Sequence, residues 1–220
     1  MKSIINNTAV ALVLGLAGAL GVATATAQGD PNAGQAKVAT CAACHGTDGN
    51  SIAPAFPKIA GQGEKYLFKQ LMDIKSGARA APQMIGQLDN SSEQDLRDMA
   101  AYFASQQQQV SGAQPISVML NSGENVDGLA LGRDLYRAGN PATGVPACMG
   151  CHSPSGLGNE PAGYPRLGGQ YAGYIEAQLK AFRTGTRAND GDTRVMRSVA
   201  KQLSDAEIKA LSQYIAGLTP

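Results

Sequence analysis

The sequence predicts an all-α fold made of two tandem domains that arose by duplication. Two C-x-x-C-H segments stand far apart in the chain, and the residues that follow them can be matched between the two halves. Apolar residues recur at helical spacing in both halves, whereas no segment shows a convincing alternating strand pattern. A length of 220 residues suits an N-terminal leader followed by one domain or two small ones.

The first 27 residues have the features of an export signal. Lys2 gives a small positive region, residues 9–22 are apolar and uncharged, and residues 25–27 supply a small-x-small cleavage pattern. An uncleaved membrane anchor is the alternative, but a span needs about 20 apolar residues, and three glycines interrupt this segment. We therefore expect cleavage after Ala27 and export to the periplasm.

Composition limits what the mature chain can bind. Without Lys2, its 17 basic side chains balance its 17 acidic ones, and no basic stripe suggests a nucleic-acid partner. The chain has no Trp, seven Tyr and four Phe, which is few for two small hydrophobic cores. A buried cofactor in each domain would supply the missing apolar bulk.

All four cysteines lie in C-x-x-C pairs, and a histidine follows each pair. The segments are Cys41-Ala42-Ala43-Cys44-His45 and Cys148-Met149-Gly150-Cys151-His152. This pattern is the signature of covalent c-type haem attachment, because one helical turn lets both thiols bond the porphyrin edge and directs the next imidazole toward the iron. A disulfide, a redox dithiol or half a zinc site would share the cysteine spacing, although His beside Cys suits tetrahedral zinc poorly. We expect two covalently bound haem c groups, each with its histidine as iron ligand.

The chain contains only these two histidines, so bis-histidine ligation and a histidine acid–base group are excluded. Methionine is the expected second ligand, and as a ligand it would stabilise Fe(II). Met84 and Met196 each stand in a predicted loop, eight residues before Ser92 and Ser204 respectively. A methionine is usually core filler, but the repeated spacing favours iron ligation by both.

Beyond the motifs the halves match at an offset of 108 positions. The matched pairs are Pro57 and Pro165, Gly61-Gln62 and Gly169-Gln170, Tyr66 and Tyr174, Gln70-Leu71 and Gln178-Leu179, Gly77 and Gly185, and Arg79 and Arg187. A metal-bound imidazole usually donates its other N–H to a carbonyl, so we expect Pro57 and Pro165 to accept those bonds. Arg79 and Arg187 are candidates to pair with haem propionates.

Each half has the same expected order of helices. Their ranges are 33–44, 65–76 and a last helix from Ser92 in the first half, and 130–136, 172–183 and a last helix from Ser204 in the second. Asp95 and Glu207, three residues after these serines, complete capping boxes. We expect a signal peptide over 1–27, domains over 28–108 and 129–220, and a linker over 109–128 that packs in part on a domain.

On these residues the sequence resembles the dihaem cytochrome c4 family. The resemblance rests on the two C-x-x-C-H motifs, the repeated Gly-Gln pairs and tyrosines, and the loop methionines. It covers essentially all of the mature chain. The resemblance implies two class I cytochrome c domains about a pseudo-two-fold axis, with haem propionate edges near their interface. Residue by residue, His45 and Met84 would bind one iron, and His152 and Met196 the other.

The resemblance also implies an electron carrier rather than an enzyme. Such proteins pass electrons from respiratory donors to a terminal oxidase or reductase, and some associate loosely with the membrane. A dihaem peroxidase, a sulfur-compound dehydrogenase and a membrane-tethered subunit are the alternatives, and the enzymes need an open iron and acid–base groups.

Arg194, Arg197 and Lys201 surround the second methionine, whereas no charge flanks the first. We expect an acidic partner at the C-terminal domain and a neutral or apolar one at the N-terminal domain.

Overall fold

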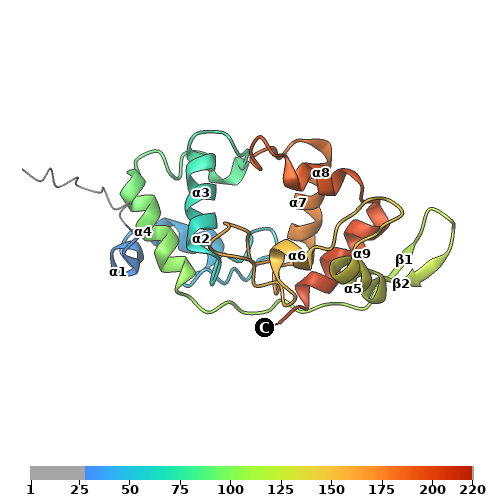
Figure 1. The fold of residues 1–220 in the computed structure, drawn as a ribbon. Coiled ribbons are helices and arrows are strands. Elements are labelled where there is room, and N and C mark those ends of the chain that lie inside the picture. Colours follow the sequence, from blue (N-terminus) through green and yellow to red (C-terminus); the bar gives the residue numbers. More distant parts are fainter. Residues whose placement is uncertain (1–27, 220) are drawn as a thin grey trace, which may run out of the picture.

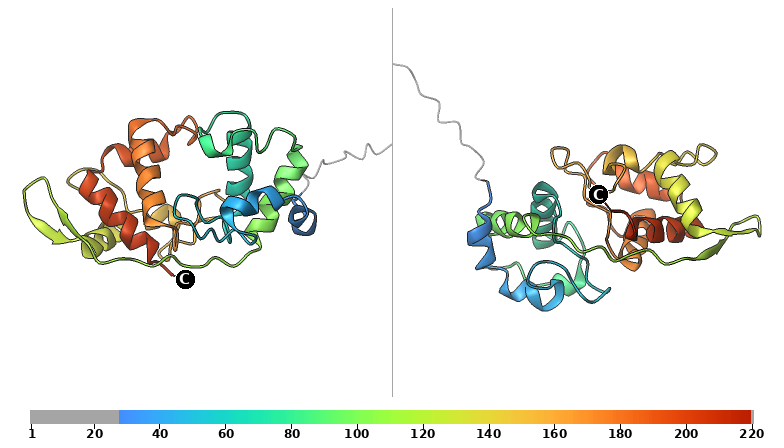
Figure 2. Two further views of the ribbon diagram at one scale, coloured as in Figure 1. Left: turned by 180° about the vertical axis from the view of Figure 1, so that it is seen from behind. Right: turned by 90° about the horizontal axis from the view of Figure 1, so that it is seen from below.

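The computed structural model describes residues 28–219, so the predicted export signal and its cleavage site after Ala27 lie outside the described residues. The N-terminal half contains α1 (Pro31–Gln35), α2 (Ala39–His45), α3 (Glu64–Lys75), the 3₁₀ turn η1 (Pro82–Met84) and α4 (Glu93–Ala104). The C-terminal half contains α5 (Gly128–Ala138), α6 (Met149–His152), α7 (Ala172–Thr184), α8 (Val195–Lys201) and α9 (Asp205–Ala216). The two halves lie side by side (Figure 1), as two further views confirm (Figure 2).

The last helix of each half begins where its capping box predicts. The hydroxyl of Ser92 accepts from the Asp95 N–H at 3.1 Å, and the Asp95 carboxylate accepts from the Ser92 N–H at 2.8 Å. Ser204 and Glu207 repeat this arrangement at 3.2 and 2.8 Å. These reciprocal bonds satisfy backbone donors that the first helical turn would otherwise leave free. The middle helices, α3 and α7, also lie within a residue of their predicted bounds.

The prediction of one helix over 33–44 is wrong, because α1 and α2 are separate. The turn between them places Lys37, whose ammonium lies 2.6 Å from the Asp98 carboxylate on α4. At Gly34, α1 lies so close to α4 that a Cβ would come within 2.0 Å of the Asp98 carbonyl oxygen. Helix α1 therefore packs on α4, whereas α2 carries the C-x-x-C-H motif. A single straight helix over both segments could not do both.

Each half has its own apolar core. In the N-terminal half the core includes Leu96 and Phe103 of α4, and in the C-terminal half it includes Ile208 and Leu211 of α9. The helix crossing at Gly34 recurs where α5 meets α9, because a Cβ on Gly132 would lie 2.3 Å from the carbonyl oxygen of Ala210. None of the helices between residues 28 and 219 is long and apolar enough to span a bilayer.

A small hairpin in the expected linker departs from the purely helical prediction. Strands β1 (Ser117–Met119) and β2 (Asn125–Asp127) pair antiparallel, with Val118 opposite Val126. Three residues a strand are too few to show an alternating pattern in the sequence. The hairpin projects at the end of the molecule far from the N-terminal half (Figure 2). Before it, the Ser111 N–H donates to the Gly169 carbonyl at 2.9 Å, so part of the linker packs on a domain as expected.

Candidate haem sites

Each C-x-x-C-H motif ends a short helix at its histidine: α2 contains the whole first motif, and α6 begins directly after Cys148. After α2 the chain turns at Gly46 with φ 79°, and after α6 it turns at Ser153 with φ 65°. No cysteine in the described chain is in a disulfide. Burial raises the pKa of the Cys41 thiol and raises the pKa of the Cys148 thiol to about 11. Attachment of two haems by thioether bonds requires four free thiols, and the structure has Cys41, Cys44, Cys148 and Cys151 as such.

The two imidazoles are buried and held in one orientation. His45 Nδ1 lies 2.9 Å from the Pro57 carbonyl oxygen, and His152 Nδ1 lies 2.9 Å from that of Pro165, so the expected partners are confirmed. A carbonyl only accepts, so each Nδ1 carries the proton and each Nε2 keeps its lone pair. Burial lowers the pKa of both rings, although the bonds to the carbonyls partly oppose it. Neutral imidazoles with a free Nε2 fit an axial haem ligand.

The two methionines stand in different local structures. Met84 ends the turn η1 and packs, like Cys41, against the core of the N-terminal half. Met196 is half-buried in the first turn of α8, so its predicted place in a loop is wrong. The turn closes because the Arg197 N–H donates to the Asp190 carboxylate at 2.9 Å, a bond between residues whose spacing gives no capping signature.

A reciprocal polar network joins the halves between α3 and α7. Each arginine donates to a glutamine of its own half and to a tyrosine of the other: Arg79 to Gln70 at 2.8 Å and Tyr174 at 2.8 Å, and Arg187 to Gln178 at 2.7 Å and Tyr66 at 3.1 Å. Burial would raise the pKa of Tyr66, but the adjacent guanidiniums lower it. The repeat revealed these residues, and the structure adds that they meet across the interface.

The sequence did not reveal an additional arm of this network. The side-chain amide of Asn189 donates to Gln70 at 2.9 Å and to the Asp73 carboxylate at 2.6 Å. The repeat has no counterpart for this arm, because Ala81 and Ala181 occupy the matching positions. The interface is therefore symmetric at its centre and carries an extra carboxylate only on the N-terminal side.

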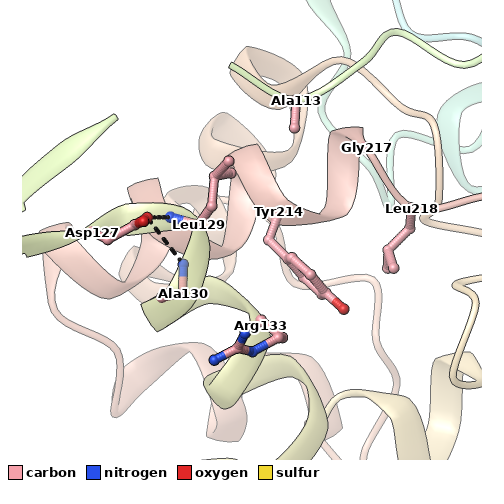
Figure 3. A pocket seen from close by; sticks show the side chains of 8 residues that line it. All are labelled: Ala113, Asp127, Leu129, Ala130, Arg133, Tyr214, Gly217 and Leu218. Carbon is pink, nitrogen blue, oxygen red and sulfur yellow. Dashed lines mark hydrogen bonds between the residues drawn. The ribbon is translucent and has the colours of Figure 1, made fainter. Parts of the chain in front are cut away.

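A surface hollow of about 400 Å³ lies between α5, α9 and the linker (Figure 3). Tyr214 and Leu218 line it, and its carboxylate, Asp127, accepts from the N–H groups of Leu129 and Ala130 and so caps α5. Neither C-x-x-C-H motif lines this hollow. Among residues 28–219, no three His, Cys, Asp or Glu side chains gather as a metal cage.

Comparison with known proteins agrees with this arrangement. The family model for cytochrome c matches residues 32–107 and again 129–219. Cytochrome c4 of Pseudomonas aeruginosa is 55% identical over 207 residues, which are 94% of this chain and 95% of that protein. The crystal structure of reduced recombinant cytochrome c4 from Pseudomonas stutzeri matches with a TM-score of 0.80 at 52% identity, over 87% of this chain and 100% of that chain.

A more distant relative carries a different name. The protein called thiosulfate dehydrogenase electron acceptor, from Stutzerimonas stutzeri, is 36% identical over 81% of this chain and 78% of its own length. The two family-model segments, each with one C-x-x-C-H motif, and the high identity over nearly the full length lead to one conclusion. The chain belongs to the cytochrome c family and, within it, to the dihaem cytochrome c4 electron-transfer proteins, with one covalent haem c at each motif.

Proposed function

We propose that this protein is a periplasmic electron carrier in which His45 and Met84 bind one iron and His152 and Met196 the other. The observation that carries the proposal is the paired imidazole geometry: both rings are buried, and both donate Nδ1–H to a proline carbonyl at 2.9 Å. The equal spacing of the two methionines from the last helices supports their role. A haem c supplies one-electron chemistry between Fe(III) and Fe(II).

The chain's own groups adapt the sites to electron transfer. The proline carbonyls fix the ring orientation and make each imidazole a better electron donor. With haem c bound, the thioethers of Met84 and Met196 would hold the irons together with the histidines, favour Fe(II) and leave no open site for small molecules. With both histidines in the motifs, the chain has no further imidazole for proton transfer. We therefore propose a carrier rather than an enzyme.

Substitution of each methionine tests the ligands. In Met84→Ala and in Met196→Ala we expect the oxidised protein to lose part of its methionine–iron charge-transfer band, and the reduced protein to bind carbon monoxide at one haem. Met99→Leu is the matched control, because Met99 is 7% exposed in the core of α4. A full band in either alanine variant would disprove that methionine's assignment, and rapid carbon monoxide binding by the native protein would favour an enzyme.

We also propose that export removes residues 1–27 and leaves domains over 28–108 and 129–220 with a linker over 109–128. The charged, apolar and small-residue order of the leader supports this. N-terminal sequencing of protein from the periplasmic fraction should begin at Gln28. An intact Met1 in the membrane fraction would instead indicate a tethered subunit.

The proposed partners are redox proteins, with a membrane-bound oxidase as acceptor. The relative named as acceptor for thiosulfate dehydrogenase makes an enzyme of that class a candidate donor. Near Met196, Arg197 lies 2.6 Å from Asp190 in an ion pair, while Arg194 and Lys201 are exposed. Near Met84 the exposed residues are uncharged, namely Pro82, Gln83, Ile85, Gly86 and Gln87, and the large apolar side chain among them is Ile85, at 78%. These surfaces support an acidic partner for the C-terminal domain and an apolar one for the N-terminal domain.

Charge reversal tests the two surfaces. Arg194→Glu with Lys201→Glu should slow electron exchange with one partner at low salt, and added salt should slow the native protein toward the same rate. Ile85→Ser should slow exchange with the other partner without this salt dependence. Unchanged rates with membranes and with soluble donors would refute the assignment.

A further inference from the structure

Two glutamines bind backbone across the domain interface. Gln62 Nε2 donates to the Arg166 carbonyl at 2.9 Å, and the Arg166 N–H donates to Gln62 Oε1 at 2.6 Å. Gln170 Nε2 donates to the Lys58 carbonyl at 2.7 Å, and the Lys58 N–H donates to Gln170 Oε1 at 3.0 Å. Each side-chain amide thus pairs with one residue of the opposite half as a neighbouring strand would.

The backbone that each glutamine binds is the backbone that holds a histidine. Lys58 follows Pro57, so the Lys58 N–H and the Pro57 carbonyl belong to the same peptide group. That peptide accepts from His45 Nδ1 at its oxygen and donates to Gln170 at its nitrogen. A continuous chain of hydrogen bonds therefore runs from the imidazole of one domain to a glutamine of the other.

The same chain exists in the opposite direction. The peptide group between Pro165 and Arg166 accepts from His152 Nδ1 and donates to Gln62. Donation at the nitrogen of a peptide makes its oxygen a stronger acceptor, because linked hydrogen bonds polarise one another. Both glutamines are buried, Gln62 at 9% and Gln170 at 5% exposure, so solvent does not replace them.

We propose that Gln62 and Gln170 are positioning residues that tune the haem potentials in trans: Gln62 acts on the haem of His152, and Gln170 acts on the haem of His45. The inference rests on the proposed axial role of the two histidines. A stronger bond at Nδ1 makes the imidazole more electron-donating, which favours Fe(III) and lowers the potential. Loss of a glutamine amide should therefore raise the potential of the haem in the opposite domain.

The test uses the intact dihaem protein with Gln62→Leu and Gln170→Leu, which remove the amide without a change of charge. A redox titration followed by NMR observes the ferric haem methyl signals of the two domains separately. We expect each variant to change the ratio of oxidised to reduced haem about threefold in the opposite domain, which at 59 mV per tenfold is about 28 mV upward. The haem of the substituted domain should keep its potential.

Gln213→Leu is the matched control, because Gln213 also accepts a backbone N–H, that of Gln114 at 3.0 Å, away from both prolines. Gln62→Met and Gln170→Met keep the side-chain length and serve if the leucine variants do not mature. A shift in the substituted domain, equal shifts in both domains, or a loss of thermal stability without a shift would overturn the proposal.

A second measurement separates this inference from the ligand assignment. Solvent exchange of the Nδ1 proton should accelerate at His152 in Gln62→Leu and at His45 in Gln170→Leu, because the acceptor peptide is less firmly held. Failure of the axial assignment would appear with both glutamines in place, as an unaltered charge-transfer band in Met84→Ala or Met196→Ala. Failure of the trans effect would appear differently: the charge-transfer band would still respond to methionine substitution, but both haem potentials would be unchanged in Gln62→Leu and Gln170→Leu.

Discussion

The crossing of α5 and α9 gives a sharp quantitative prediction at Gly132. A Cβ at this position would lie 2.3 Å from the Ala210 carbonyl oxygen and 2.8 Å from the Tyr214 Cβ. An ordinary van der Waals contact is at least 3.4 Å, so Gly132→Ala requires the two helices to separate by about 1 Å. The atoms that must move belong mainly to backbone, so a side-chain rotation cannot relieve the contact.

The cost follows from two opposing effects. Overpacking of a close contact costs about 3 kcal/mol at the upper end of its usual range, which applies to rigid backbone. The higher helix propensity of alanine over glycine returns about 1 kcal/mol. The free energy of unfolding of the C-terminal half should fall by about 2 kcal/mol.

Urea unfolding followed by circular dichroism measures this change. With a denaturant slope of about 2 kcal/mol per M, the transition of the C-terminal half should move down by about 1 M. Gly173→Ala is the matched control, because Gly173 lies in α7 with nothing within 4 Å of an added Cβ. It should be neutral or stabilise by up to about 1 kcal/mol. A Gly132→Ala protein as stable as the control would refute the close-packing argument.

Two further predictions concern buried polar groups. Hydrogen bonds from the Asp30 N–H and from Lys37 lower the pKa of the Asp98 carboxyl in the folded protein. The ionised carboxylate therefore stabilises the fold fully above the unfolded pKa of about 3.9. This stabilisation is lost as pH falls through the lower folded pKa. Asp98→Asn should lower the melting temperature at pH 7 and flatten its acid dependence below about pH 4, which calorimetry across pH would show; an unchanged acid profile would contradict this. Tyr136 is fully buried and donates to the Ser153 carbonyl at 2.6 Å; Tyr136→Phe should cost about 1 kcal/mol in urea unfolding, and no loss would show that the bond contributes nothing.

Features that depend on adjacent residues were predictable from the sequence. The capping boxes at Ser92 and Ser204 identify two helix starts, because both partners of each box lie within one turn. The C-x-x-C-H motifs identify the haem sites for the same reason. The proline acceptors required the repeat as well, since only the matching positions of Pro57 and Pro165 distinguished them from other residues of the loops.

Features that depend on distant residues were not predictable in this way. The break between α1 and α2 follows from the packing of Gly34 on α4, more than 60 positions away. The helix that contains Met196 depends on Asp190, which supplies a carboxylate from the preceding loop. The glutamine pairs were visible as repeated residues, but nothing local indicated that each binds the other copy's proline peptide.

The connection between the domains leaves almost no slack. Asn50 of the N-terminal half accepts from the Gln109 N–H at 2.7 Å, and the Ser111 N–H donates to the Gly169 carbonyl of the C-terminal half at 2.9 Å. Only Val110 therefore lies between the residues that are hydrogen-bonded to the two halves. A tether this short gives the docked halves a very high effective concentration, so even modest polar contacts keep them together. A flexible insertion after Val110 would lower that effective concentration, so the spacing between the two redox centres would then depend on the interface contacts alone.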